Sequence, residues 1–283
     1  MDRRHFLSAA GMLPLVALGE ERPLTTQPKR SKPPARKLAL VATTYGYLSH
    51  AYHIAGRFIN GYHTQLGHHF PDFGIASMFV EQVGTKDLSK TIAKQHDIKH
   101  VANIAEALTL GTGKLAVDGV LLIGEHGDYP YNLKGQKLYP RYEMFQKIVE
   151  VFRASNKVVP VFNDKHLSYD RKKGFEMVET AKKLEFPLMA GSSLPVTWRR
   201  PEVELKLGTK MTEALVVSRG ELEIYGIHAL EALQCMVERR TKGQQGVKAV
   251  EYLEGEAVWK AGDDKRWSWE LLEHALGRSA SRN

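Results

Sequence analysis

Imidazole and carboxylate side chains gather at the ends of several apolar segments of this chain. They are His50, His53, Glu125, His126, Asp128, Asp164, His166, His228 and Glu231. Imidazole and carboxylate groups together are ligands for zinc, iron or manganese. A set made of His50, Glu125, His126 and His166 could hold a divalent metal in a sugar lyase or hydrolase. The same side chains could instead line a polar sugar pocket without a metal, because the sequence contains no H-E-x-x-H spacing.

A loop with several hydroxyl groups, residues 43–49 (TTYGYLS), follows the first apolar run. Its aliphatic hydroxyl side chains are those of Thr43, Thr44 and Ser49. They could hydrogen-bond a phosphate at the beginning of the next helix, where the helix dipole favours an anion. Gly46 is the loop's one glycine, whereas dinucleotide-binding loops of the G-x-G-x-x-G type have three. We also expect Tyr45 and Tyr47 to crowd the usual position of a dinucleotide.

Short apolar runs alternate with amphipathic segments from residue 37 to residue 195. The pattern predicts strands at 38–42, 75–83, 117–124, 158–162 and 188–190, with helices between them. Runs that are apolar on both faces are typical of a parallel sheet covered by helices on both sides. The fold class expected is therefore α/β: a Rossmann-type parallel sheet with helices on both faces, followed by a reduced α+β C-terminal segment. Ligands of such sheets bind at the carboxyl ends of the strands.

Four later segments follow one another in a distinctive order. They are VDGVLLIGEHGDYPYN (residues 117–132), VVPVFNDKHLSYD (158–170), LMAGSSLPVTWRR (188–200) and GIHALE (226–231). In this order they resemble four motifs of the Gfo/Idh/MocA (glucose–fructose oxidoreductase/inositol dehydrogenase) family. Those motifs are a strand ending near VDAVVIATPNHLH, a strand ending in Glu-Lys-Pro, the exit GHNLRF, and Gly-x-His-x-x-Asp. The chain resembles a divergent and C-terminally short member of that family.

The resemblance implies an oxidoreductase that acts on a sugar or polyol with NAD or NADP. It places Lys165 at the lysine of Glu-Lys-Pro and His228 at the histidine of Gly-x-His-x-x-Asp, on either side of the reacting carbon. Such a pair would supply a base for the hydroxyl proton and a cation for the developing alkoxide. His228 begins a predicted helix, whose dipole would disfavour a protonated ring.

The resemblance also implies binding residues for both ligands. Those for the cofactor are Thr43, Thr44, Tyr45, Gly46, Ser49, Gly124, Glu125, His126 and Asp164. Those for the substrate are Asp128, Trp198, Arg199 and Glu231. Glu81 is a loose match for the acid that binds the ribose. Asp164 and His166 stand where the family has Glu and Pro, which together with the single glycine puts nucleotide binding in question.

Composition narrows the class of protein. The chain has 283 residues and a formal net charge of +8, but five of its basic residues lie within residues 27–37. No basic helix is interleaved with aromatic residues, so we expect no nucleic-acid partner. Cys235 is the single cysteine, which excludes an intrachain disulfide. Neither the composition nor the motifs decide between a monomer and a homo-oligomer.

The N-terminus resembles an export signal. Arg3 and Arg4 precede an apolar run at residues 9–18, which is too short to span a bilayer. We therefore expect a twin-arginine-type signal peptide at 1–19, export to the periplasm and no stable membrane span. A proline-rich disordered linker at 20–36, a Rossmann-like domain at 37–195 and a short α+β domain at 196–283 would follow. A non-catalytic sugar-binding protein on this scaffold is a further alternative.

Overall fold

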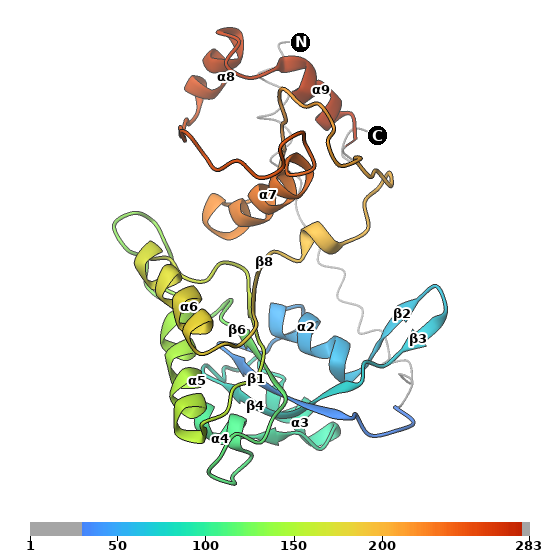
Figure 1. Cartoon of the computed structure of the whole chain (residues 1–283), viewed down its shortest axis with the longest axis vertical. Helices are drawn as coiled ribbons and strands as arrows, with labels where there is room; N and C mark the ends of the chain where they lie inside the picture. The colour runs from blue at the N-terminus through green and yellow to red at the C-terminus, as the bar shows by residue number, and fades with distance from the viewer. Residues whose placement is uncertain (1–29, 279–283) are drawn as a thin grey trace. The chain divides into compact units, whose positions relative to one another are not determined.

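The computed structural model describes residues 30–278, which divide into two units (Figure 1). The first consists of residues 30–197 together with Gly220–His228. The second consists of Trp198–Arg219 and residues 229–278. The expected signal peptide at 1–19 and the linker up to residue 29 lie outside the described residues. The candidate chemistry lies mainly in the first unit.

The first unit is built on one parallel sheet. Its strands are β1 (Arg36–Ala42), β4 (Phe73–Val80), β5 (Lys99–His100), β6 (Gly119–Ile123), β7 (Val161–Asp164) and β8 (Leu188–Gly191). They lie in the order β5-β4-β1-β6-β7-β8, and every neighbouring pair is parallel. Counted along the chain, this is the 3-2-1-4-5-6 order of the doubly wound Rossmann fold. The predicted fold class is confirmed for this unit, and the strand order reverses between β1 and β6.

Helices cover both faces of the sheet. On one face lie α2 (His50–Ile59) and α3 (Ser89–Gln95), and on the other lie α4 (Ile104–Thr109), α5 (Arg141–Ser155) and α6 (Arg171–Lys183). Side chains of β1 alternate between the two cores: Leu38 and Leu40 join the core under α2, whereas Ala39 and Val41 join the core under α5. A strand points successive side chains to opposite faces, so a central strand must be apolar throughout.

Side-chain caps set where two of these helices begin. The Ser49 hydroxyl accepts a hydrogen bond from the backbone N–H of Tyr52 at 3.2 Å, so His50 is the first residue of α2. Asn103 accepts one from the N–H of Glu106 at 2.8 Å, as its capping-box spacing predicts. The cap at Ser49 matters for the site, because it fixes the direction in which His50 leaves the loop after β1.

Two short elements were not predicted from the sequence. β2 (Tyr62–Thr64) and β3 (Gly67–His69) form an antiparallel hairpin after α2. β5 adds an edge strand of only two residues to the sheet. Both elements are too short to display the period-two alternation by which a strand is recognised.

The last part of the predicted linker belongs to the fold. The guanidinium of Arg30 donates hydrogen bonds to the backbone carbonyl oxygens of Pro71, Phe58 and Phe73, at 2.6 to 3.1 Å. Arg36 is already the first residue of β1. The boundary of the disordered linker at residue 36 is therefore too late. The prolines and charges of this segment predicted a linker. The sequence did not reveal the contacts of Arg30, because its partners lie far away along the chain.

The second unit is helical where the sequence pattern indicated a mixture of helix and strand. The chain from residue 192 to residue 278 contains the short 3-10 helix η1 (Leu194–Val196), α7 (Leu222–Val237), α8 (Glu256–Asp263) and α9 (Trp269–Leu276), and no strand. Only residues 229–237 of α7 belong to this unit. Val216 and Val247, two apolar residues of the part expected to be α+β, are exposed and lie in loops. A short apolar run forms a strand only where a neighbouring strand can pair with its backbone groups.

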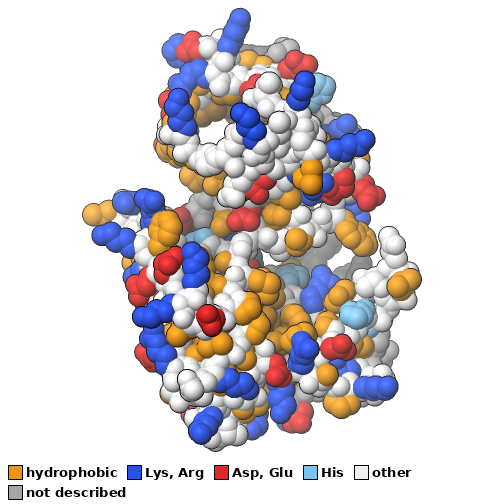
Figure 2. Space-filling model, viewed as in Figure 1, with side chains coloured by type: hydrophobic (Ala, Val, Ile, Leu, Met, Phe, Trp, Pro, Cys, Tyr) orange, Lys and Arg blue, Asp and Glu red, His pale blue; other side chains and the backbone are white. Residues whose placement is uncertain are grey.

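Charged side chains of both signs are interspersed on the face shown in Figure 2. Within residues 30–278, no helix combines the length and the apolar character that a bilayer crossing requires.

The core under α5 provides a test of the fold. Phe152 is 1% exposed and packs edge-on against Phe186, at 5.2 Å between ring centroids. Phe152→Ala is expected to lower the free energy of unfolding by about 3–5 kcal/mol, because it leaves a cavity in a close-packed core. Urea denaturation followed by circular dichroism measures the change. Phe175→Ala, at a side chain that is 56% exposed, is the matched control and should cost less than about 1 kcal/mol.

Candidate active site

A pocket of about 640 Å³ opens at the carboxyl ends of β1, β4 and β6. It is lined by Thr44, Tyr45, Gly46, Tyr47, Leu48, Ser49, Gln82, Gly84, Lys86, Asp87 and His126. Its volume is in the range of small-molecule and cofactor sites. The pocket lies where the strand order reverses, which is the place where open α/β sheets bind ligands.

The loop after β1 leaves more room than its sequence indicates. The side chain of Tyr45 is 2% exposed and packs in the core between β1 and α2. Burial is also the largest cause that raises its pKa. Tyr47 is 72% exposed, and its ring lies edge-on to that of Tyr52, at 5.5 Å between centroids. The expectation that both tyrosines crowd the pocket is wrong for Tyr45, because the ring turns into the core.

The expected cofactor-binding residues divide into two groups. Five line the pocket: Thr44, Tyr45, Gly46, Ser49 and His126. Four are buried and are not among its lining residues: Thr43, Gly124, Glu125 and Asp164. The hydroxyl of Thr43 donates to the backbone carbonyl of Glu125 at 2.7 Å, so its only proton is already used. Thr43 therefore joins β1 to the end of β6, and the expectation that it binds phosphate is not met.

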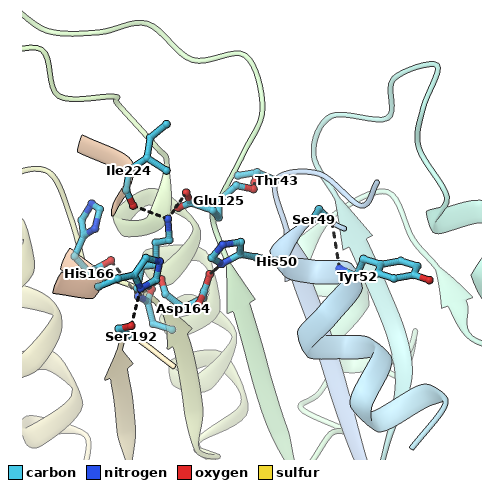
Figure 3. Close-up of polar contacts among 12 residues, drawn as sticks. Thr43, Ser49, His50, Tyr52, Glu125, Asp164, His166, Ser192 and Ile224 are labelled. Atoms are coloured by element: carbon cyan, nitrogen blue, oxygen red, sulfur yellow. Dashed lines mark hydrogen bonds and ion pairs between the residues drawn. The ribbon is translucent and has the colours of Figure 1, made fainter. Parts of the chain in front are cut away.

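The buried carboxylate of Glu125, which is labelled in Figure 3, forms ion pairs with two cations. Glu125 is 3% exposed, and its Oε1 atom accepts a hydrogen bond from Lys165 Nζ at 2.7 Å. Its Oε2 atom accepts one from the guanidinium of Arg141, which is 1% exposed. Lys165 Nζ also donates to the backbone carbonyl of Ile224 at 3.0 Å. An ammonium group has three donors, so one N–H of Lys165 is left by these two contacts.

The backbone at Lys165 is fixed as firmly as its side chain. Its φ is +61°, in the left-handed region that residues other than glycine rarely adopt. Its N–H donates to the carbonyl of Gly191 at 3.0 Å, and the N–H of Gly191 donates back at 2.9 Å. This pair of hydrogen bonds with the end of β8 holds the unusual conformation, which directs the Lys165 side chain to Glu125.

His166 is held as a neutral ring. Its Nε2 atom lies 3.1 Å from a terminal nitrogen of Arg141. A guanidinium can only donate, so Nε2 accepts and the ring proton is on Nδ1. Burial, and then the charge of Arg141, lower the pKa of His166 to about 4. The ring is therefore a hydrogen-bond partner of Arg141 at neutral pH.

Three other imidazole rings lie together at the same edge of the sheet. His50 Nδ1 is 2.6 Å from Asp164 Oδ2, a contact that joins the start of α2 to the end of β7 (Figure 3). The ring of His50 is edge-on to His126 at 5.2 Å between centroids and stacked on His228 at 6.3 Å. His228 Nδ1 is 2.6 Å from the hydroxyl of Ser192.

His228 does not begin its helix, contrary to the expectation from the sequence. α7 starts at Leu222, so His228 lies in the second turn, beyond the strongest influence of the helix dipole. Burial lowers the pKa of His228, and the positive charge of Lys165 lowers it further. The ring is thus kept neutral, as predicted, but for a different physical reason.

The described residues do not assemble the alternative metal site. Among them, no group of three or more His, Cys, Asp or Glu residues is arranged to hold a metal ion. Both carboxylate oxygens of Glu125 accept from cations, and His166 Nε2 accepts from Arg141. Two of the four expected ligands, Glu125 and His166, are therefore already engaged within the protein.

The residues expected to bind the substrate or the ribose are spread over both units. Asp128 is exposed, and its backbone exchanges two hydrogen bonds with the side chain of Gln82. Glu81 follows β4 and accepts a hydrogen bond from the hydroxyl of Tyr129. Three residues belong to the second unit: Trp198, Arg199 and Glu231. Arg199 forms an ion pair with Glu204 there.

Sequence reasoning missed Arg141, although a signal for it exists. Arg141 shares the buried face of α5 with Phe145, Ile148 and Phe152, at helical spacing. An arginine on an apolar stripe needs a buried partner for its charge. That signal predicts a carboxylate nearby, but it does not say which one. Ser192, Gln82, Lys86 and Asp87 carry no comparable signal.

No protein-family model and no curated protein matches the chain. Solved structures that are similar include the dehydrogenase MviM from Clostridium difficile, with 17% identity and a TM-score of 0.34 over 55% of this chain and 39% of that one. An oxidoreductase from Agrobacterium radiobacter, in complex with NAD+, L-tartaric acid and magnesium, has 20% identity and a TM-score of 0.34, with 55% and 35% covered.

The WlbA dehydrogenase from Chromobacterium violaceum, in complex with NADH and UDP-GlcNAcA, has 15% identity and a TM-score of 0.35. That match covers 58% of this chain and 36% of that one. The chain thus spans less than two-fifths of the length of each of these three proteins.

The buried charges around Glu125 provide a second test. Glu125→Gln leaves Arg141 and Lys165 without their anionic partner, and is expected to lower the free energy of unfolding by about 3 kcal/mol. Urea denaturation at pH 7 measures this loss. Glu143→Gln is the control, because the Glu143–Lys173 pair is 47% and 31% exposed and should contribute less than about 1 kcal/mol. Equal losses in the two variants would contradict the description of the cluster.

His166 predicts a dependence of stability on pH. Its pKa is about 4 in the folded chain against an ordinary value of 6.5, so the unfolded chain binds a proton first as the pH falls. The contribution is complete above pH 6.5 and is lost as the pH falls towards 4. Between pH 7 and pH 5, the wild type should lose about 2 kcal/mol more stability than His166→Gln. His53→Gln, at an exposed ring on α2, should behave like the wild type.

Proposed function

We propose that this protein is an oxidoreductase of the Gfo/Idh/MocA kind, which transfers hydride between a sugar or polyol and a nicotinamide dinucleotide, NAD or NADP. The observation that carries this proposal is the pocket at the point where the strand order of a 3-2-1-4-5-6 sheet reverses. Sheets of this order bind dinucleotides at that point. The fold by itself does not determine the activity or the substrate, and both are part of this proposal.

The residues at this pocket fit a dinucleotide. α2 begins at the pocket wall, and the N-terminus of a helix attracts phosphate through its free N–H groups and its dipole. Thr44, which carries a hydroxyl, and Lys86, which carries a positive charge, are also lining residues of this pocket. Since Tyr45 is turned into the core, the single-glycine loop still leaves about 640 Å³. We propose Thr44, Gly46, Ser49, Lys86 and His126 as the residues that hold the dinucleotide.

The buried groups beside the pocket fit the chemistry of alcohol oxidation. A nicotinamide ring, when bound, accepts or gives the hydride. We propose that Lys165 and His228 flank the reacting carbon, as the resemblance implies. Lys165 is held by Glu125 and by the carbonyl of Ile224, so its remaining N–H is oriented before the substrate binds. A charge fixed in advance stabilises a developing alkoxide without reorganisation.

Export and the nature of the substrate are further parts of the proposal. Paired arginines before a short apolar run support a twin-arginine route to the periplasm, which carries proteins that are already folded. A protein that binds its cofactor in the cytoplasm and contains one cysteine suits that route. Within the first unit, Asp128 remains our proposed contact for a sugar or polyol.

Binding of the dinucleotide is the decisive measurement. We expect the purified chain to bind NAD(H) or NADP(H) in isothermal titration calorimetry. Lys86→Ala should weaken that binding about tenfold, because it removes a positive charge from the pocket wall. Lys90→Ala, an exposed lysine on α3 that is not among the lining residues, is the matched control and should bind like the wild type. A folded chain that binds neither dinucleotide would overturn the proposal.

A further inference from the structure

We propose that His50 and Asp164 form the proton-accepting dyad of this site: His50 Nε2 takes the proton of the substrate hydroxyl, and Asp164 positions the ring. The inference rests on the proposed hydride transfer and names the residue that completes it. His50 is not one of the two residues that the resemblance places at the reacting carbon. Its assignment comes from the contact between α2 and β7.

The geometry determines which nitrogen of His50 is free. Its Nδ1 atom lies 2.6 Å from Asp164 Oδ2. An ionised carboxylate can only accept, so the proton of the neutral ring is on Nδ1 and the lone pair is on Nε2. The side chain of Asp164 is 4% exposed, whereas that of His50 is 27% exposed. The carboxylate is therefore held inside the protein, and the ring that it orients reaches the surface of the site.

The fold holds both members of the dyad on regular elements. His50 is the first residue of α2, directly after its cap Ser49. Asp164 is the last residue of β7, where it pairs with Gly191 of β8. The contact bridges two elements on either side of the point where the strand order reverses. Since His126 lines the pocket and its ring lies edge-on to that of His50, the dyad borders the proposed dinucleotide position.

The groups that face each ring distinguish His50 from His228 as the base. The Nδ1 atom of His228 faces the neutral hydroxyl of Ser192, whereas the Nδ1 atom of His50 faces a carboxylate. The charge of Lys165 also disfavours a proton on His228. A protonated His50, in contrast, would be paired directly with buried Asp164. His228 then serves as a hydrogen-bonding group for the substrate, and His50 as the group that becomes charged.

The O–H bond of the substrate alcohol breaks and its proton goes to His50 Nε2, which gives an imidazolium paired with Asp164. The hydrogen on the same carbon leaves with its electron pair and reduces the oxidised nicotinamide. The oxygen keeps the electron pair of the O–H bond and uses it to form the carbonyl. Lys165 provides the positive charge beside that oxygen during the transfer.

Kinetics of four chains test this assignment: the wild type, His50→Ala, Asp164→Asn and the control His53→Ala. His53 lies on the same helix, one turn of chain from Ser49, and is exposed. Dinucleotide affinity is measured first, and we expect all four values to agree within about threefold. Reduction of NAD or NADP is then followed with a panel of aldoses, hexitols and inositols.

We expect His50→Ala to lower kcat about 10²–10⁴-fold, the usual contribution of a general base, and added imidazole to restore part of it. Asp164→Asn should lower kcat by at least tenfold without rescue by imidazole, and His53→Ala should match the wild type. A wild type that turns over while His50→Ala keeps its kcat overturns the dyad but leaves the proposed function intact. A wild type that binds no dinucleotide, or reduces none with any panel member, overturns the proposed function and the role of the dyad with it.

The tautomer of His50 gives a readout that needs no substrate. ¹⁵N-resolved NMR of the folded chain at pH 8 should show the ring proton of His50 on Nδ1, and Asp164→Ala should return the ring to a mixture of both tautomers. A wild-type ring protonated on Nε2 would overturn the dyad whatever the kinetics show. This measurement separates the orientation of the ring from any loss of stability in the variants.

Discussion

Ion pairing at Glu125 is the constraint on which the rest of the site depends. Removing three charged groups from water is very unfavourable unless each one is paired with good geometry. Here one carboxylate accepts from Arg141 at the start of α5 and from Lys165 after β7. Gly124 makes this possible, because a Cβ atom there would lie 2.6 Å from Cγ of Arg141. Gly124 therefore leaves the space that Arg141 needs in order to reach Glu125.

The same cluster gathers several elements at one edge of the sheet. Thr43 connects β1 to the backbone of Glu125, and Lys165 connects the end of β7 to the carbonyl of Ile224. The left-handed backbone at Lys165 is held by its paired hydrogen bonds with Gly191. Each contact uses a polar group that would otherwise be buried without a partner. Stability and orientation of the site thus have a common physical origin.

The pocket-lining residues and the ionisable residues of the site lie mainly on different sides of the point where the strand order reverses. Loops after β1 and β4 form most of the open pocket, with hydroxyl groups, one lysine and the beginning of α2. Residues after β6 and β7 supply the ionisable groups behind it. His50 joins the two sides, because it lies on the helix of the first and is hydrogen-bonded to an acid of the second. A cofactor on one side would meet acid–base groups on the other.

The sequence by itself determined the succession of the main strands and helices along the chain, the two-sided apolar character of β1 and the caps at Ser49 and Asn103. These features follow from neighbouring residues, and local periodicity records them. The sequence also showed that most of the ionisable residues of the site stand at or just after the ends of strands. Tertiary structure alone decided that Tyr45 turns into the core, that Arg141 pairs with Glu125 and that His50 meets Asp164, which is 114 residues away in sequence. Such contacts depend on strand order and on which charges can be buried together, and these are properties of the assembled sheet.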